Sequence, residues 1–419
     1  MTVAVERKRI GGAATSDAPR LPRTGPARRA AALLLTLSAL LITGCVQVPE
    51  ITLTAEPPAR GALVSVEAAR GVPRWLSRLA LWGGRLPGPT PLSCGARLWR
   101  LVYWTEDHAG HLVQASGLYA EPSCVPPRAL LSYQHGTVSS RDEVPSAPSQ
   151  EGLAAAVVFA GAGYLTVAAD YLGMGRSTGV QPYLHVESTV HATRDLLIAA
   201  RTLARTRGTP WPEPLLLTGF SQGGHATAAL HRALEAQPLE GSRLIASAIG
   251  SAPFDLAGIS LPVALEGAST DHTEYLSYLT HGYSDVYGHP LGSLLAEPWA
   301  TIVPGLLSGE HEDDELPRDP RALFTTDFLD AYDAGTRTWF LEALDENDTY
   351  RWAPRAPMRV YYGSLDQAVS PRDARFGVEE MRRRGGDVTL IEIGPLGHQD
   401  AALQAVPRIR AWFDALTAP

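Results

Sequence analysis

A serine flanked by glycines lies where a predicted strand meets a predicted helix. The segment Leu215–Gly224, LLLTGFSQGG, places Ser221 between Gly219 and Gly223. A tight strand-to-helix turn lifts such a hydroxyl clear of the sheet edge. It leaves no room for side chains two residues before and after the serine, which explains both glycines. The positive end of the following helix points to the place where an oxyanion would form. The pattern predicts that Ser221 is a nucleophile.

A serine hydroxyl is a weak nucleophile unless a base takes its proton and an acid orients that base. Asp366 follows the predicted strand RVYYGS within GSLDQAVSP, and His398 follows the predicted strand TLIEIG within GPLGHQD. Ligand-facing groups in open α/β sheets gather at the carboxyl ends of the strands. We therefore expect Ser221, Asp366 and His398 to meet at one sheet edge as a catalytic triad.

Other residues of the same types have weaker positions in the sequence. Asp255 also follows a predicted strand and is the reserve candidate for the acid. His225 lies one turn into the helix after the serine, where packing is the expected role. His185 and His191 flank a helix start and have no acid partner that the sequence places beside them.

An acyl-transfer serine also requires donors for the developing oxyanion, and two backbone N–H groups are predicted to supply them. One belongs to Gln222, directly after the nucleophile. The second comes from the loop SYQHGT after an early strand, where Thr137 is the expected donor and Gly136 the alternative. A plain turn is the simpler interpretation of that loop. Loss of one such donor typically lowers the rate by about 10²–10³.

Short apolar strands alternate with helices along most of the chain, which predicts a mostly parallel sheet with helices on both faces. The strand-like runs are 97–106, 111–122, 128–136, 164–170, 213–221, 243–253, 357–366 and 387–394, with helical runs at 190–204 and 372–385. About a hundred residues rich in Leu, Tyr, Ser and Ala, with interspersed prolines, interrupt this alternation. A structureless loop that long is improbable in a compact domain. We interpret it as a helical cap. The predicted organisation is a signal peptide at 1–44, an N-terminal tether at 45–95, a core at 96–255 and 355–419, and the cap at 256–354.

The charge balance excludes one class of partner. The 419 residues carry a formal charge of −8, and removal of the first 44 leaves 29 basic and 42 acidic side chains, a charge of −13. A surface this acidic repels phosphate backbones, so nucleic acid is not an expected partner.

The N-terminus resembles a bacterial export signal. Arg28 and Arg29 precede the 13-residue apolar run Ala30–Ile42, which is short for a membrane span but typical of a signal-peptide core. The run ends in ITGC, which resembles a lipobox, so lipidation of Cys45 is expected; a plain signal peptide is the alternative.

The remaining two cysteines are then expected in an oxidising compartment. Cys94 and Cys124 most simply form a disulfide there, with two buried free thiols as the alternative. Neither cysteine has neighbouring His or Cys residues that suggest a metal site.

Several of these segments together resemble the α/β-hydrolases, within them the secretory-lipase group and its bacterial lipase-like relatives. The matching segments are SYQHGT, ADYLGMG, QPYL, GFSQGG, GSLDQAVSP and GPLGHQD. The resemblance implies an α/β-hydrolase fold with a helical cap between the sixth and seventh strands. It implies that Ser221 is the nucleophile, Asp366 the orienting acid and His398 the base. It also implies that no cofactor or metal is required, and that four residues form a structural loop beside the pocket: Asp170, Tyr171, Gly173 and Gly175.

The expected function is hydrolysis of carboxylic esters, as an esterase or lipase, through an acyl-enzyme. The expected partners are a small-molecule ester or lipid substrate and a membrane reached through the anchor at Cys45. The expected location is the bacterial cell envelope, facing the periplasm or the surface, or outside the cell after secretion. Two alternatives remain open at this stage: an exopeptidase or amidase with the same triad, and a surface lipoprotein that has lost catalysis.

Overall fold

A nine-stranded sheet forms the centre of the part of the chain that the computed structural model describes, which is residues 59–69, 71–75, 94–267 and 269–418. The strand order is β1-β2-β3-β5-β4-β6-β7-β8-β9. Pairing is antiparallel from β1 to β5 and parallel from β5 onward. The strands are β1 (Leu63–Ala68), β2 (Ala96–Glu106), β3 (Leu112–Pro122), β4 (Ala129–Gln134), β5 (Tyr164–Ala169), β6 (Pro214–Phe220), β7 (Arg243–Gly250), β8 (Met358–Gly363) and β9 (Val388–Gly394).

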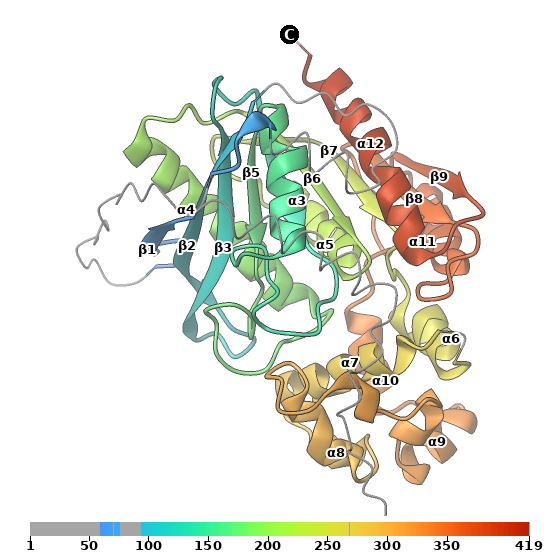
Figure 1. Ribbon diagram of the computed structural model, residues 1–419. Coiled ribbons are helices and arrows are strands. Elements are labelled where there is room, and N and C mark those ends of the chain that lie inside the picture. The colour runs from blue at the N-terminus through green and yellow to red at the C-terminus, as the bar shows by residue number, and fades with distance from the viewer. Residues whose placement is uncertain (1–58, 70, 76–93, 268, 419) are drawn as a thin grey trace, which may run out of the picture. The chain divides into compact units, whose positions relative to one another are not determined.

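Helices cover both faces of the sheet, because alternate residues of each buried strand point to opposite sides. In β6, Leu215 and Leu217 pack with Leu196 and Leu230 on one face, whereas Leu216 packs in the cluster on the other face. Figure 1 shows α3 in front of the strands. The core helices are α3 (Gln150–Val158), η1 (Ala160–Ala162), α4 (Val186–Arg207), α5 (Gln222–Ala236), α11 (Pro371–Arg383) and α12 (His398–Leu416).

The N-terminal edge of the sheet includes a strand that the sequence pattern did not indicate. β1 pairs antiparallel with β2, so part of the predicted tether at 45–95 belongs to the sheet. Its sequence, LVSVEA, is short and lies in a segment rich in proline and glycine, where turn residues hide the strand pattern. Beside it, Cys94 and Cys124 form a disulfide between the start of β2 and the end of β3. With a sequence separation of 30 residues, this bridge contributes about 3–4 kcal/mol in the chain-entropy model.

The predicted helical cap is confirmed. It lies between β7 and β8, which are the sixth and seventh of the strands that the sequence predicts, since β1 is not among those. Figure 1 shows it in yellow and orange beyond one end of the sheet. The cap has an apolar core of its own, which includes Leu276, Tyr283 and Phe340. Its elements are η2 (Leu256–Ser260), α6 (Leu261–Leu265), α7 (His272–Tyr287), η3 (Leu291–Ser293), α8 (Trp299–Ile302), η4 (Val303–Gly305), η5 (Asp313–Glu315), η6 (Pro320–Leu323), α9 (Thr326–Asp333) and α10 (Trp339–Glu346).

The two ends of the cap meet where they join the core. The N–H of Leu256 donates to Asp348 Oδ1 over 2.9 Å, and the N–H of Thr349 donates to the Phe254 carbonyl over 3.1 Å. Asp373 of α11 holds the segment that leaves β7, because its Oδ1 accepts the N–H of Phe254 over 2.9 Å. We call this arrangement the cap junction. It fixes both ends of the insertion on the core.

The predicted signal peptide at 1–44 and Cys45 lie outside the described residues. Within the described ranges, no helix combines the length and the apolar character that crossing a bilayer requires.

Candidate active site

Ser221 occupies a sharp turn between β6 and α5. Its backbone has φ 58° and ψ −124°, a sparsely populated conformation that costs about 1–3 kcal/mol. The N–H of Ser221 donates to the Gly250 carbonyl of β7 over 2.9 Å, which holds the turn against the neighbouring strand. Although Ser221 is the N-cap residue of α5, its side chain makes no capping hydrogen bond. The hydroxyl is therefore not committed to stabilising the helix.

The glycines of the turn are required by space, as the sequence predicts. A Cβ on Gly219 would overlap the Gly223 carbonyl, and one on Gly223 would overlap the Gln134 carbonyl of β4. At Gly224 a Cβ would lie 2.7 Å from that of Ala252. Strand β4, the turn and α5 therefore pack backbone against backbone around the serine.

Asp366 and His398 form a hydrogen-bonded pair. His398 Nδ1 lies 2.7 Å from Asp366 Oδ2, and both side chains are almost completely buried. The other carboxylate oxygen of Asp366 accepts the N–H groups of Ala368 over 3.1 Å and Val369 over 3.0 Å. The carboxylate is held at both oxygens, so it fixes the orientation of the imidazole. With Nδ1 as the donor to Asp366, Nε2 is the ring nitrogen that can accept a proton.

The loops that carry this pair are joined by backbone hydrogen bonds. After β8, the N–H of Ser364 donates to the Gly394 carbonyl over 2.9 Å, and that of Leu365 donates to the Leu396 carbonyl over 3.2 Å. His398 then begins α12. The parallel neighbours β8 and β9 therefore end side by side, as the sequence argument requires.

The imidazole lies beside the serine turn. The ring of Phe220, the residue before Ser221, has its centroid 4.7 Å from that of His398. No hydrogen bond joins the Ser221 hydroxyl to His398 within the described ranges, a common situation in hydrolases without substrate. The structure thus brings the three predicted residues to one sheet edge, with the acid and base in direct contact and the serine next to the base.

The predicted oxyanion loop follows β4 and packs against the same turn. A Cβ on Gly223 would lie 2.7 Å from the His135 carbonyl, so the loop backbone passes close to the elbow. The ring of His135 stacks on Tyr171 with centroids 4.2 Å apart, and the Tyr171 hydroxyl donates to the His135 carbonyl over 3.1 Å. At the end of the loop, Thr137 Oγ1 lies 2.6 Å from Tyr183 Oη. The sequence did not indicate this partner of Thr137.

Asp170 anchors the segment that supports the oxyanion loop. It is buried, and its carboxylate accepts the N–H of Ser146 over 2.9 Å and the Ser116 hydroxyl over 2.5 Å. Burial raises the pKa of Asp170 above its ordinary value. The residue that follows, Tyr171, has φ 69°, so the segment is held in a strained conformation by these contacts. This geometry agrees with a structural role beside the pocket.

The reserve candidates have structural contacts. Asp255 caps η2, where its Oδ1 accepts the Gly258 N–H over 2.7 Å. The Nε2 of His225 lies 2.9 Å from the Asn347 carbonyl of the cap. His185 is the N-cap residue of α4. Burial lowers the pKa of both His185 and His225 to about 4, so both rings are neutral near pH 7. His191 Nδ1 lies 3.3 Å from the Glu106 carbonyl.

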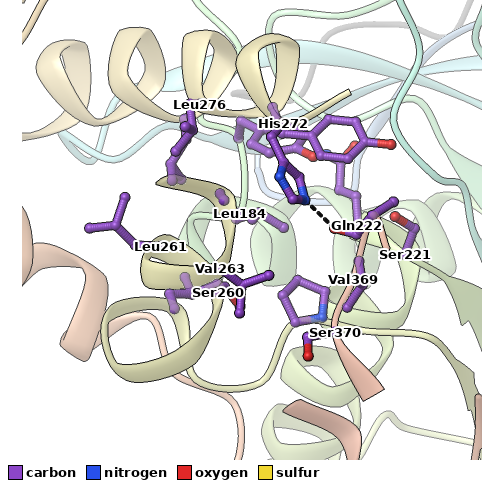
Figure 2. A pocket seen from close by; sticks show the side chains of 17 residues that line it. Leu184, Ser221, Gln222, Ser260, Leu261, Val263, His272, Leu276, Val369 and Ser370 are labelled. Carbon is purple, nitrogen blue, oxygen red and sulfur yellow. Dashed lines mark hydrogen bonds between the residues drawn. The ribbon is translucent and has the colours of Figure 1, made fainter. Parts of the chain in front are cut away.

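A pocket opens at the serine and runs under the cap. The cavity has a volume of about 70 Å³, measured as the space open to the centre of a water-sized sphere, and both Ser221 and Gln222 line its wall. Figure 2 shows these two residues on one side and Leu261 and Leu276 of the cap on the other. The lining is mainly aliphatic and comes from both parts of the fold: Leu184 and Val369 from the core, and Leu261, Val263, Leu276 and Leu279 from the cap. Within the described ranges, no group of three or more His, Cys, Asp or Glu side chains is arranged to hold a metal ion.

Comparison with known proteins places these observations in context. No protein-family model matches the chain, and no curated protein matches it. Among solved structures, a protein of Legionella pneumophila to which a hydrolase function has been ascribed aligns with a TM-score of 0.78 and 27% identity, over 85% of this chain and 98% of that one. The rice cell wall degrading esterase LipA of Xanthomonas oryzae aligns with a TM-score of 0.76 and 26% identity, over 86% and 99%. Candida antarctica lipase A aligns with a TM-score of 0.58 and 16% identity, over 82% and 79%, a likeness of fold alone. The chain therefore has the α/β-hydrolase fold, with a helical cap over the carboxyl edge of its sheet.

Proposed function

We propose that this protein is a serine hydrolase that cleaves carboxylic esters through an acyl-enzyme. The observation that carries the proposal is the buried pair of His398 and Asp366, 2.7 Å apart, beside the strained turn at Ser221. The structural similarity to a cell wall degrading esterase at 26% identity over nearly its whole length supports ester chemistry over the exopeptidase alternative.

In the proposed reaction, His398 Nε2 takes the proton of Ser221 Oγ as that oxygen attacks the ester carbonyl carbon. The carbonyl oxygen becomes an oxyanion and accepts hydrogen bonds from the N–H groups of Thr137 and Gln222. His398 then returns the proton to the alcohol oxygen as the C–O bond breaks. Water repeats the sequence, giving its proton to His398, and the acid leaves while Ser221 regains its hydrogen. Asp366 holds the imidazole and stabilises its charged form.

The pocket suggests which part of the substrate enters the cap. Its wall begins at Ser221 and continues along aliphatic side chains of both core and cap. An apolar acyl group fits that lining, because its burial releases water from surfaces of the same kind. We therefore propose esters with an apolar acyl group, lipids among them, as the substrate class.

Covalent labelling of the purified protein tests the nucleophile. A fluorophosphonate probe is expected to label the wild type and to leave Ser221→Ala unlabelled. Ser277→Ala is a matched control, because Ser277 is a buried serine of α7 whose hydroxyl donates to the Thr273 carbonyl over 2.8 Å. This variant is expected to keep its label. An unlabelled wild type would support the catalytically inactive lipoprotein instead.

A substrate panel tests the bond that is cleaved. Nitrophenyl esters of increasing acyl length are compared with aminoacyl nitroanilides under the same conditions. Higher kcat/KM for the esters is expected, and a consistent preference for the anilides would replace the ester assignment with the amidase alternative.

We further propose that the chain is anchored to a bacterial membrane through a lipidated Cys45. The proposal rests on the sequence before that residue, and the disulfide between Cys94 and Cys124 agrees with an exported protein. Metabolic labelling with radioactive palmitate is expected to mark the wild type but not Cys45→Ser. An unlabelled wild type would favour the plain signal peptide.

A further inference from the structure

Two hydroxyl groups meet at the end of the oxyanion loop. Thr137 Oγ1 and Tyr183 Oη lie 2.6 Å apart, and either atom can be the donor. Thr137 ends the loop after β4 and is half-buried, whereas Tyr183 is buried and precedes α4. The residues are 46 positions apart in the chain, so only the fold brings them together.

One of the two hydroxyl protons of this pair has no acceptor in the described part of the protein. Two hydroxyls carry two protons, but the hydrogen bond between them requires only one. Within the described ranges, neither hydroxyl has a second acceptor. Burial raises the pKa of Tyr183 above its ordinary value, so its phenol stays protonated and both protons are present. One O–H therefore remains available to a ligand.

The surroundings of the pair bring it close to the serine turn. The backbone of Gln134 and His135 packs directly on Gly223, two residues after the nucleophile, and Thr137 follows within two residues of that contact. On the other side, Tyr183 lines the same pocket as Ser221. The hydroxyl pair thus connects the oxyanion loop to the pocket wall.

We propose that Thr137 donates its side-chain O–H, in addition to its backbone N–H, to the oxyanion formed during ester cleavage. Tyr183 donates to Thr137 Oγ1 and directs the remaining proton of Thr137 toward the substrate oxygen. Thr137 is then a catalytic residue through two of its groups, and Tyr183 is a positioning residue. No covalent bond changes at either hydroxyl, since the hydrogen bond only strengthens as negative charge develops on the carbonyl oxygen. This inference rests on the proposed ester hydrolysis.

The structural alternative is that the two hydroxyls merely fasten the loop to the core. The ring of Tyr183 also packs edge-on against Tyr278 of the cap, with centroids 5.9 Å apart. Tyr183→Phe keeps this ring contact and removes only the hydroxyl. Thr137→Val keeps the shape of the side chain and the backbone N–H. The two variants therefore separate the hydroxyl chemistry from packing and from the backbone donor.

Steady-state kinetics on a short nitrophenyl ester tests the proposal. Thr137→Val is expected to lower kcat by about 10²-fold, the lower end of the range for one lost oxyanion donor, with KM within about twofold. Thr137→Ser keeps a hydroxyl at this position, so its kcat is expected to stay within about threefold of the wild type. That change is much smaller than the loss expected when an oxyanion donor is removed. Tyr183→Phe is expected to lower kcat by about tenfold through loss of the directing hydrogen bond. Because the two hydroxyls act as a unit, the double variant Thr137→Val/Tyr183→Phe is expected to be no slower than Thr137→Val.

Two control variants make the same chemical changes away from the site. The Tyr103 hydroxyl donates to the Ala192 carbonyl over 2.7 Å, and the Thr193 hydroxyl donates to the Thr189 carbonyl over 2.7 Å. Both side chains are buried. Tyr103→Phe and Thr193→Val are expected to lower the melting temperature but to leave kcat unchanged.

The outcomes distinguish this inference from the proposed function. A wild type without esterase activity would reject the function itself. An active wild type with Thr137→Val at the wild-type kcat would reject only the side-chain donor. If Thr137→Val does not fold, Thr137→Ser and Tyr183→Phe still decide. A Tyr183→Phe variant that loses stability at unchanged kcat would leave the pair a purely structural contact and overturn the proposal.

Discussion

The sheet edge and the cap hold their functional side chains in different ways. At the sheet edge, backbone groups fix each polar residue: the Gly250 carbonyl fixes Ser221, and the N–H groups of Ala368 and Val369 fix Asp366. In the cap, the pocket wall is mainly aliphatic, and side chains such as Leu261 belong to the apolar cluster of the cap. For the proposed hydrolysis, the difference teaches that proton transfer requires fixed directions, whereas selection of the acyl group requires only shape and volume. The two properties can then be changed separately.

The strongest test of this comparison is a conservative change of the acid. Asp366→Asn keeps the shape but removes the acceptor that holds His398 Nδ1–H, so the imidazole loses its required tautomer. With the proposed triad, the expected loss in kcat is about 10⁴-fold. Asp255→Asn is the matched control, since asparagine caps a helix as well as aspartate does, and its kcat is expected to stay near the wild type. Steady-state kinetics on one nitrophenyl ester measures both variants.

The pair of variants also discriminates between the two acid candidates. A large loss of kcat in Asp255→Asn, together with near-normal kcat in Asp366→Asn, would assign the acid role to Asp255.

A change in the cap is expected to act on selectivity alone. Val263→Phe narrows the pocket beyond the serine, so kcat/KM for a nitrophenyl octanoate is expected to fall about tenfold or more relative to the acetate. Turnover of the acetate is expected to remain within about twofold of the wild type, since the acyl-chain contacts that distinguish substrates amount to about 1–3 kcal/mol. Ile302→Phe is a control, because Ile302 belongs to the cap but is not part of the pocket lining. Equal losses for both esters would show that the cap also controls the chemistry.

The smallest expected effect concerns the cap junction and pH. Burial raises the pKa of Asp348 and of Asp373 to about 7, and the charge of Asp255 adds to both shifts. A carboxyl group with a raised folded-state pKa contributes stability at low pH, and this contribution is lost as the pH rises through about 7. Asp345 also raises the pKa of Asp348, whereas Arg351 lowers it. The melting temperature is therefore expected to fall as the pH rises from about 4, the ordinary pKa of an aspartate, to about 7, and to level off above that.

The corresponding variant removes one of these titrations. Asp373→Asn keeps an acceptor for the N–H of Phe254 and cannot ionise, so its melting temperature is expected to change less over the same pH interval, by about 2–4 °C. Thermal unfolding followed by circular dichroism measures this. A wild-type melting temperature that rises with pH would contradict the assignment.

The sequence could predict that Ser221, Asp366 and His398 lie at one sheet edge, because the signals that place them are local. The glycines around Ser221 and the strands before Asp366 and His398 lie within a few residues of the side chains that they position. Parallel strand order then brings distant loops to one edge without further information. The fold class and the cap follow from the same alternation of strands and helices.

Other features depend on contacts that no local pattern encodes. Tyr183 reaches Thr137 only through the fold, and nothing near Tyr183 in the sequence indicates an oxyanion-loop partner. The pocket wall combines core and cap residues such as Leu184 and Leu276. Its lining could not be predicted from the sequence, because the position of the cap on the core was not known. Several cap elements span only three or four residues, for example Leu291–Ser293 and Trp299–Ile302, which is too short to show helical periodicity.

The meeting of the cap's two ends has a consequence for how such proteins diversify. Because Leu256 bonds to Asp348 and Thr349 bonds back to Phe254, the insertion leaves and re-enters the core at one point. A segment attached in this way can be exchanged for another of different length while the strands on either side keep their register. Chimeras that carry foreign inserts between these positions are thus a direct way to vary the pocket wall while the candidate site at the sheet edge stays the same.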